Sequence, residues 1–206
     1  MTSSEITTVD ALTELVGEPN ERARNKVRSA LHDLDRQWLA ASPFCLLATA
    51  DADGRCDVSP KGDPAGDLVH VLDDRTLALA ERPGNRRVDG FRNVLANPHV
   101  GLIFLIPGRG DTLRVNGRAR LVSDAPFFDA MVVKGHRPLV ALVVEVEEVF
   151  HHCSKAFLRS QLWEPGSWAD PVPPRPVIAR TLEAPEESLE TLAAYYGPAY
   201  AAKLYG

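Results

Sequence analysis

Residues 99–122 read HVGLIFLIPGRGDTLRVNGRARLV, and this stretch decides the fold. Its first part, His99–Ile106, is a nearly unbroken apolar run of the kind that forms a buried strand. Pro107–Gly110 predicts a turn. In Thr112–Val122, apolar residues alternate with Arg and Asn, which is typical of a strand with one buried face and one face in water. The stretch therefore predicts two antiparallel strands joined by a short turn.

Further strands are predicted on both sides of this pair. They are bounded by turn signals such as Asp51-Ala52-Asp53-Gly54, and they span Phe44–Ala50, Cys56–Pro60, Leu68–Leu72, Thr76–Ala80 and Leu139–Phe150. Pro60 cannot donate to a sheet ladder, so its strand is expected at a sheet edge. Strands in hairpin order with helices at the periphery predict a mainly β fold, a six- to seven-stranded antiparallel β-barrel.

Helices are predicted before, within and after these strands. Their ranges are 8–16, 20–41, 88–95, 124–133, 154–162 and 186–196. The longest pattern is 20–41, where Val27, Leu31, Leu34 and Trp38 share one face. We therefore expect three regions: an N-terminal helical segment packing on the barrel (1–41), the barrel (42–163), and an arm with a C-terminal helix (164–206). Five prolines in 164–176 predict that the arm is extended.

The composition of the 206 residues is that of an ordinary globular protein, with 45% hydrophobic and 25% charged residues and a net charge of -5. Its apolar runs are too short to span a bilayer, and its N-terminus lacks the pattern of a signal peptide, so a cytoplasmic location without membrane association is expected. The three cysteines, Cys45, Cys56 and Cys153, are an odd number without a Cys-x-x-Cys pair, so they predict small buried or half-buried side chains and no disulfide framework.

Arg82–Val88 reads RPGNRRV and places two adjacent guanidinium groups after a Pro-Gly turn and before a predicted helix. Free N–H groups at a helix start attract anions, and Arg supplies planar, forked donors that fit phosphate oxygens. A local basic cluster in an acidic chain favours one small anionic ligand over nucleic acid. The alternative is an ordinary solvated turn.

His151-His152-Cys153 invites a metal interpretation. Neighbouring residues on a strand point to opposite faces, which makes three consecutive ligands awkward. We therefore predict no zinc site. Haem with a histidine as axial ligand remains an alternative.

The order of these segments resembles that of the pyridoxamine 5'-phosphate oxidase-like, FMN-binding split-barrel family, over roughly residues 40–165. The segments that carry the resemblance are Val58–Gly62, Asn85–Arg87, Asn97–Val100 and Thr112–Arg118. The chain looks closest to a branch described as FMN-dependent enzymes. The resemblance implies a split barrel and a homodimer with FMN in clefts between the subunits.

The resemblance also implies which residues contact the cofactor. Ser59 and Lys61 correspond to the strand beside the flavin, and Asn85, Arg86 and Arg87 correspond to the turn that holds the phosphate. Thr112 and Arg114 lie on the strand that crosses the flavin, where Thr112 replaces an amide side chain. On the helix typical of this branch, Lys155, Arg159 and Trp163 share a face, which is expected to reach the cleft. The alternative is a surface face with Trp163 as a packing anchor. Lys61 could contact either the flavin edge or the phosphate.

The last thirty residues lack the Arg-x-His motif with which pyridoxamine phosphate oxidases hold their substrate. We therefore expect an FMN-dependent oxidoreductase that is not an authentic pyridoxamine phosphate oxidase. It would act on a small molecule, with NADH or NADPH among the candidate electron donors. The alternatives are a flavin- or haem-binding storage or sensing protein without turnover, and a deazaflavin-dependent reductase. No catalytic side chain is assigned.

Overall fold

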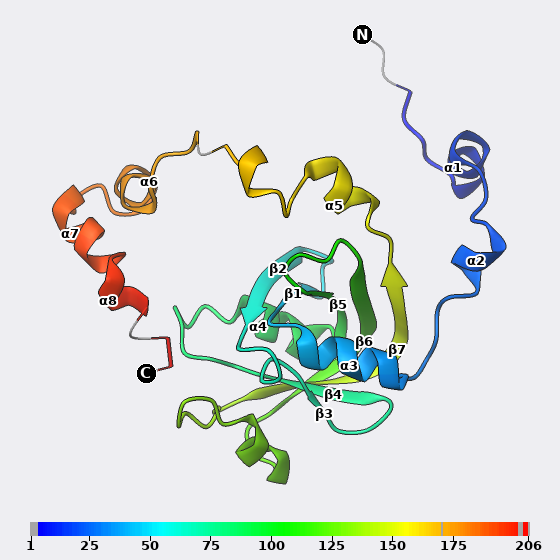
Figure 1. Cartoon of the computed structure of the whole chain (residues 1–206), viewed down its shortest axis with the longest axis horizontal. Helices are drawn as coiled ribbons and strands as arrows, with labels where there is room; N and C mark the ends of the chain where they lie inside the picture. The colour runs from blue at the N-terminus through cyan, green and yellow to red at the C-terminus, as the bar shows by residue number, and fades with distance from the viewer. Residues whose placement is uncertain (1–3, 170, 202–203, 206) are drawn as a thin grey trace.

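The computed structural model describes residues 4–169, 171–201, 204 and 205 (Figure 1). Over these residues the strands form one seven-stranded antiparallel sheet in the order β2-β1-β5-β6-β7-β4-β3. The strands are β1 (Phe44–Ala50), β2 (Cys56–Gly62), β3 (His70–Val71), β4 (Thr76–Ala80), β5 (His99–Leu105), β6 (Thr112–Val122) and β7 (Ala141–His152). The predicted mainly β fold with peripheral helices is confirmed.

The stretch 99–122 lies at the centre of the sheet. β5 and β6 pair in antiparallel register from His99 opposite Arg118 to Phe104 opposite Leu113. The alternation in β6 continues through a β-bulge at Gly117, where a Cβ atom would lie 1.9 Å from the carbonyl oxygen of Glu145. Only a residue without a side chain allows β7 to approach so closely.

The inner side chains of the curved sheet form the main hydrophobic core. Fully buried members include Leu47, Phe104 and Val115, and α3 closes one end of the core with Trp38 and Leu39. A smaller core lies between β4, β7 and the 3-10 helix η1. β2 lies at an edge of the sheet, as Pro60 predicts.

The helices lie around the sheet. They are α1 (Val9–Val16), α2 (Glu21–Arg24), α3 (Asp33–Ala41), α4 (Asp89–Ala96), α5 (Lys155–Ser160), α6 (Arg175–Leu182), α7 (Leu189–Tyr195) and α8 (Pro198–Ala201), with the 3-10 helices η1 (Pro126–Met131) and η2 (Pro165–Ser167). Within the described ranges, every helix falls short of the length and apolar character needed to cross a bilayer.

The predicted continuous helix over 20–41 is wrong. The chain leaves the helical path after α2, and the backbone of Arg28 pairs with that of Val149 on β7. Leu31 then donates its N–H to the carbonyl of Asp74, and helix resumes at α3, capped by His32. Tertiary pairing therefore outweighs the helical spacing of the apolar residues. The helix predicted over 124–133 is also wrong in type and length, because this segment forms only the short 3-10 helix η1, Pro126–Met131.

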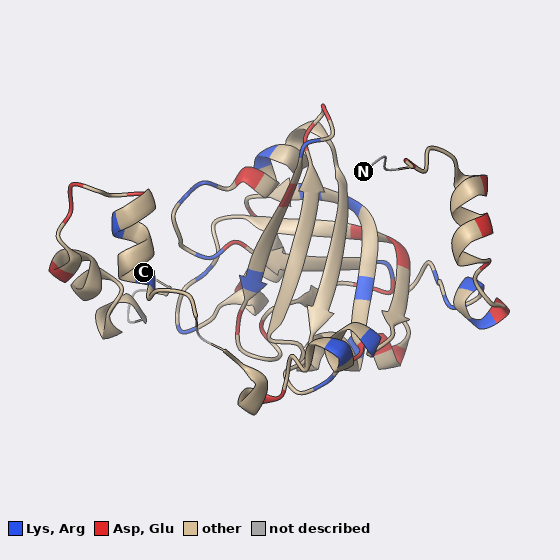
Figure 2. Cartoon of the chain, turned by 90° about the horizontal axis from the view of Figure 1, so that it is seen from above, with Lys and Arg blue, Asp and Glu red and all other residues tan. Residues whose placement is uncertain are grey.

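The two ends of the chain extend from the barrel on opposite sides (Figures 1 and 2). α1 is capped by Thr8 at its start and by Gly17 at its end, as predicted, but none of its described residues is buried. On the other side, α6 and α7 pack on each other, with Ala179 and Leu192 buried. Within the described part of the segment 1–41, contacts with the barrel begin at Lys26 and Arg28, which contact β7, and continue through α3, and the packing expected for the rest of the segment stays a prediction.

Candidate functional site

A cavity of about 560 Å³ lies where β2, the end of β4 and the start of α4 meet. Its size falls within the range of small-ligand sites. β2 alternates along its length, so Asp57, Ser59 and Lys61 are half-buried while Val58 and Pro60 are exposed. The cavity is lined by both β2 and the loop 82–88, and Leu204 and Tyr205 complete it.

The loop 82–88 has a strained backbone. Arg86 has φ +60° and Val88 has φ +47°, in the left-handed region that side-chain-bearing residues rarely adopt. For a β-branched residue such as Val88 this conformation is a genuine outlier, and such strain gathers at ligand sites. Val88 is also the N-cap of α4, and among the described residues no side chain caps this helix. Its first N–H groups thus remain available to an anion.

The cations of the cavity differ in their partners. Lys61 lies 3.4 Å from Glu81 and over the ring of Phe91. Arg87 pairs with Asp89 at 2.7 Å, and its N–H donates to Asn85. Arg86 is exposed and has no ion pair within the described part of the chain. Arg86 is therefore the cation most readily available to a ligand.

Asp63 and Arg82 form the most buried ion pair of the cavity. The Nε of Arg82 donates to Asp63 at 2.8 Å, and the two side chains are 13% and 3% exposed. Another guanidinium nitrogen of Arg82 donates to the carbonyl of Met131, on η1. The other carboxylate oxygen of Asp63 accepts a hydrogen bond from the hydroxyl of Tyr205. Burial is the main cause that raises the pKa of Tyr205, followed by the carboxylate of Asp63, so this hydroxyl remains a donor at neutral pH.

The structure brings together half of the cofactor contacts predicted from sequence. Ser59, Lys61, Asn85, Arg86 and Arg87 all line the cavity. The other five predicted residues lie elsewhere on the chain. Thr112 and Arg114 are on β6, three strands from β2 in the sheet. Thr112 is buried, and Arg114 lies against the ring of Phe150. The remaining three residues are Lys155, Arg159 and Trp163.

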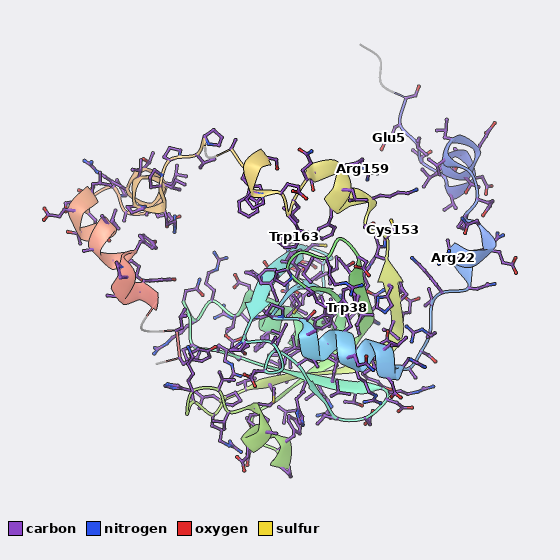
Figure 3. All side chains as sticks on the ribbon, viewed as in Figure 1. Glu5, Arg22, Trp38, Cys153, Arg159 and Trp163 are labelled. Atoms are coloured by element: carbon purple, nitrogen blue, oxygen red, sulfur yellow. The ribbon has the colours of Figure 1, made fainter. Side chains whose placement is uncertain are left out.

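Trp163, which is labelled in Figure 3, borders a second cavity that is also lined by α5 and the β5–β6 turn. Its ring stacks on Phe157, and its Nε1 donates to the carbonyl of Arg109 at 2.6 Å. Lys155 and Arg159 are exposed on α5. In the single chain Trp163 thus anchors α5 to the barrel, which is the packing role considered as the alternative.

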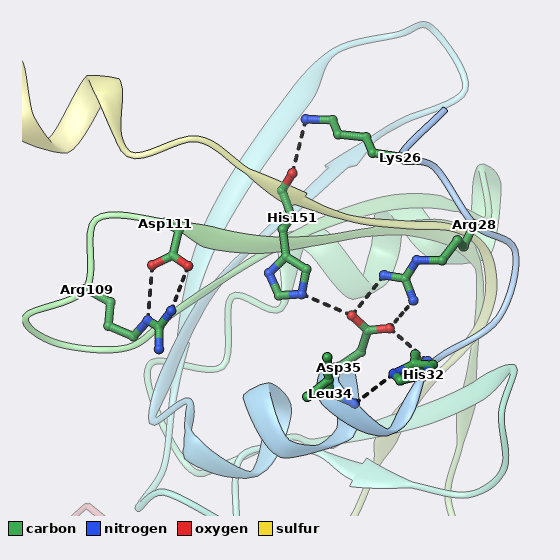
Figure 4. A network of polar contacts seen from close by, with 8 residues as sticks. All are labelled: Lys26, Arg28, His32, Leu34, Asp35, Arg109, Asp111 and His151. Carbon is green, nitrogen blue, oxygen red and sulfur yellow. Dashed lines mark hydrogen bonds and ion pairs between the residues drawn. The ribbon is translucent and has the colours of Figure 1, made fainter. Parts of the chain in front are cut away.

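A separate polar network joins the N-terminal segment to β7 (Figure 4). Arg28 donates through two nitrogens to the carboxylate of Asp35, which is 1% exposed. Asp35 also accepts from the backbone N–H of His32 and contacts His151 at 3.2 Å. Burial works to raise the pKa of Asp35, but the hydrogen bonds from Arg28 and His32 outweigh it and hold the pKa below its ordinary value.

The histidines and cysteines do not gather into a metal site in the part of the chain that the structure describes. On β7, His151 faces Trp38 and Asp35, while the pKa of His152 is lowered by burial and by the charges of Lys26 and Arg114. Cys45 is buried, as expected, but Cys56 and Cys153 are exposed.

Sequence reasoning missed four charged or hydrogen-bonding residues of the cavity: Asp63, Glu81, Arg82 as the partner of Asp63, and Tyr205. Local signals exist for the first three, because Asp63 directly follows Lys61-Gly62 and the other two precede the Pro-Gly turn. Tyr205 has none, since it is 142 residues from its partner Asp63.

Comparisons with known proteins give a clear family match. A family model described as Pyridoxamine 5'-phosphate oxidase matches residues 31–153, which include the sheet, the loop 82–88 and α4. No curated protein matches the chain.

Several solved structures are similar. A proposed pyridoxamine 5'-phosphate oxidase from Lactobacillus delbrueckii is 25% identical, with 61% of this chain and 98% of that chain covered and a TM-score of 0.48. HupZ from Group A Streptococcus is 18% identical, with coverages of 59% and 93% and a TM-score of 0.48. An F420 reductase is 19% identical, with coverages of 55% and 93% and a TM-score of 0.38.

Proposed function

The chain belongs to the pyridoxamine 5'-phosphate oxidase family, and from this premise we propose that it is an FMN-dependent oxidoreductase acting on a small molecule. The observation that carries the proposal is the strained, basic loop 82–88 at the uncapped start of α4, beside a cavity of about 560 Å³. A phosphate monoester carries nearly two negative charges and accepts several hydrogen bonds, which these groups can supply. These groups therefore fit the phosphate of FMN.

The loop holds the phosphate in this proposal. Arg86 binds it directly, and Arg87 exchanges its contact with Asp89 for the phosphate oxygens. Charge-assisted hydrogen bonds of this kind are stronger than neutral ones. The N–H groups at the start of α4 add donors whose dipoles favour a negative charge.

Lys61 and Ser59 contact the cofactor from β2, on the face that the alternation of this edge strand turns to the cavity. When bound, FMN supplies the electron-transfer chemistry, while the protein binds and orients it and sets the local charge. Lys61, held by Glu81 and Phe91, places a positive charge at the cavity wall. A positive charge there favours the binding of electron-rich, anionic groups.

Oxidation of a vitamin B6 phosphate is not part of the proposal, because the C-terminal region lacks an Arg-x-His motif. A reduced nicotinamide is the electron donor that we propose to test first. Flavin or haem binding without turnover, and deazaflavin-dependent reduction, are the outcomes that would replace this function.

We also propose that the protein is a homodimer. α1 exposes Val9, Leu15 and Val16 to between 69% and 78%, and none of its described residues is buried. An eight-residue helix is marginal in water without tertiary packing, so a covering surface is expected. A second copy would supply it, and would bring Lys155 and Arg159 of one subunit toward the cavity of the other. Light scattering of the full chain should then give twice the mass of one chain.

The test is a fluorescence titration of the purified protein with FMN, deazaflavin cofactor and haem. Changing Arg86 and Arg87 together to Ala should weaken FMN binding at least tenfold, since a hydrogen bond to a charged group contributes about 1.5–3 kcal/mol. Arg92→Ala, an exposed Arg on α4 outside the cavity, is the matched control and should leave the affinity unchanged. Equal affinity of the double variant and the wild type would refute the phosphate assignment.

Turnover is tested by mixing the FMN-loaded protein with NADH or NADPH in a stopped-flow spectrometer. Bleaching of the bound flavin, followed by its return with an added acceptor, is the result expected of an oxidoreductase. A flavin that no reductant bleaches would indicate a binding protein instead.

A further inference from the structure

The C-terminal end of the chain is part of the cavity wall. Leu204 and Tyr205 line the same cavity as the loop 82–88 and β2, although the helices before them lie to one side of the barrel (Figure 1). Tyr205 is half-buried there. A residue at the far end of the sequence therefore borders the proposed cofactor site.

Tyr205 is held in this position by four contacts. Its hydroxyl donates to Asp63 at 2.8 Å, and its ring lies over His136 with the ring centres 6.0 Å apart. The cationic groups of Arg82 and Lys134 lie 5.9 and 5.3 Å from the ring centre. Cation–π and hydrogen-bonding contacts converge on one side chain, which indicates a specific docking position.

Through Asp63, Tyr205 is connected to the loop that is proposed to bind phosphate. Asp63 receives one hydrogen bond from Tyr205 and one from Arg82, and Arg82 is the first residue of that loop. The carboxylate of Asp63 is 3% exposed, so water cannot readily replace a lost donor. One nitrogen of Arg82, Nη1, is buried without a hydrogen-bond partner among the described residues. Arg82 is therefore held by two contacts, the carboxylate of Asp63 and the carbonyl of Met131.

We propose that Tyr205 is a positioning residue of the phosphate-binding loop: by holding Asp63, it fixes Arg82 and keeps residues 82–88 in the strained form that binds an anion. The identity of that anion as FMN rests on the function proposed above. The C-terminal tail is thus a component of the site. It acts on the loop through two successive contacts, from Tyr205 to Asp63 and from Asp63 to Arg82.

The first test uses the protein without cofactor. Amide hydrogen exchange is measured for wild type, Tyr205→Phe and Tyr200→Phe, the last being a matched control because Tyr200 is exposed on α8. Tyr205→Phe keeps the ring and removes only the hydroxyl. We expect exchange of the Arg87 amide, whose N–H donates to Asn85, to become about tenfold faster in this variant, which corresponds to about 1.4 kcal/mol, and to stay unchanged in the control. Unchanged exchange of this amide in Tyr205→Phe would overturn the proposal.

The second test compares FMN with riboflavin, which lacks the phosphate. Tyr205→Phe should reduce the affinity ratio of FMN to riboflavin about tenfold while leaving riboflavin affinity as it is, an effect that general destabilisation would not produce. A ratio equal to that of the wild type would mean that Tyr205 only attaches the C-terminal tail to the barrel, and it would overturn the proposal.

A wild type that does not prefer FMN over riboflavin would refute the proposed function but would not decide the role of Tyr205. That role is then judged with inorganic phosphate as the probe. Protection of 82–88 by phosphate in the wild type, lost in Tyr205→Phe, supports the proposal, and equal protection in both proteins refutes it.

Discussion

Asn in place of Asp35 should destabilise the fold strongly and in a pH-dependent way. Asp35 is 1% exposed and receives two hydrogen bonds from Arg28 and one from the N–H of His32 (Figure 4). The substitution keeps the shape of the side chain and the acceptor for His32. It removes the charge, and it turns an amide donor toward the guanidinium of Arg28.

The magnitude follows from the burial of the pair. Breaking a buried ion pair by removing one partner costs about 3–5 kcal/mol, because the other charge is left uncompensated. Arg28 is 38% exposed and regains some water, so the lower end, about 3 kcal/mol, is expected. For a chain of this size this corresponds to a decrease of roughly 6–12 °C in the melting temperature.

The effect should depend on pH in a defined direction. The pKa of Asp35 is held below its ordinary value in the folded protein, so the ionised side chain stabilises the fold at pH values above the unfolded pKa of about 3.9. This contribution is lost as the pH falls through the folded pKa. The difference between wild type and Asp35→Asn should therefore shrink as the pH falls below about pH 4.

Urea unfolding followed by circular dichroism, repeated from pH 3 to pH 8, measures this difference. Asp33→Asn is the control, since Asp33 is on the same helix but is 89% exposed and should change stability by less than about 0.5 kcal/mol. Equal stability of Asp35→Asn and wild type at pH 7, or a difference that grows as the pH falls below about 4, would refute the reasoning.

Two further predictions concern the packing of the sheet. Gly117→Ala places a methyl group against the carbonyl of Glu145 and should lower stability by at least about 3 kcal/mol, measured by thermal unfolding, whereas Gly166→Ala, in open space, should be nearly neutral. In a thiol-labelling assay at pH 8, Cys56 and Cys153 should react in the folded protein and Cys45 only after unfolding, because burial raises the pKa of Cys45 to about 12; three rapidly reacting thiols in the folded state would contradict this.

The strands could be predicted because their signals are local. The alternation in Thr112–Val122 and the turn at Asp51–Gly54 each depend on a few neighbouring residues, and the structure confirms both strands of each pair. Pro60 even indicated the sheet edge, since it lacks the N–H that an inner strand would need.

The structure of the segment 20–41 could not be predicted correctly, because it depends on contacts with residues that are distant in the sequence. Val27, Leu31, Leu34 and Trp38 have helical spacing, yet only Leu31 and Trp38 are buried. The backbone of Arg28 pairs with β7, and the backbone of Leu31 donates to Asp74, each partner more than forty residues further along the chain. Spacing alone cannot distinguish a continuous helix from two helices separated by such a pairing.

The candidate site shows the same division between local and distant information. Ser59, Lys61 and the loop 82–88 are short segments whose composition carries the chemistry, and the fold places them at one cavity. Thr112 has the right neighbours in sequence but is buried within its own chain. Tyr205 reaches the cavity from the far end of the chain, so only the three-dimensional structure reveals it.

The charges of the cavity indicate how an anion would be selected. Lys61, Arg82 and Arg87 each have an acidic partner in the single chain, so the two charges within each pair compensate each other. Arg82 is held by a buried carboxylate, whereas Arg87 and Asp89 are more exposed and their pair is weak. A phosphate that enters the cavity can therefore bind both Arg86 and Arg87, because the weak pair of Arg87 with Asp89 is easily broken. The Arg82–Asp63 pair stays intact and continues to support the loop. A neutral ligand cannot compensate for breaking the ion pair between Arg87 and Asp89. The arrangement therefore favours ligands that carry a phosphate over ligands that do not.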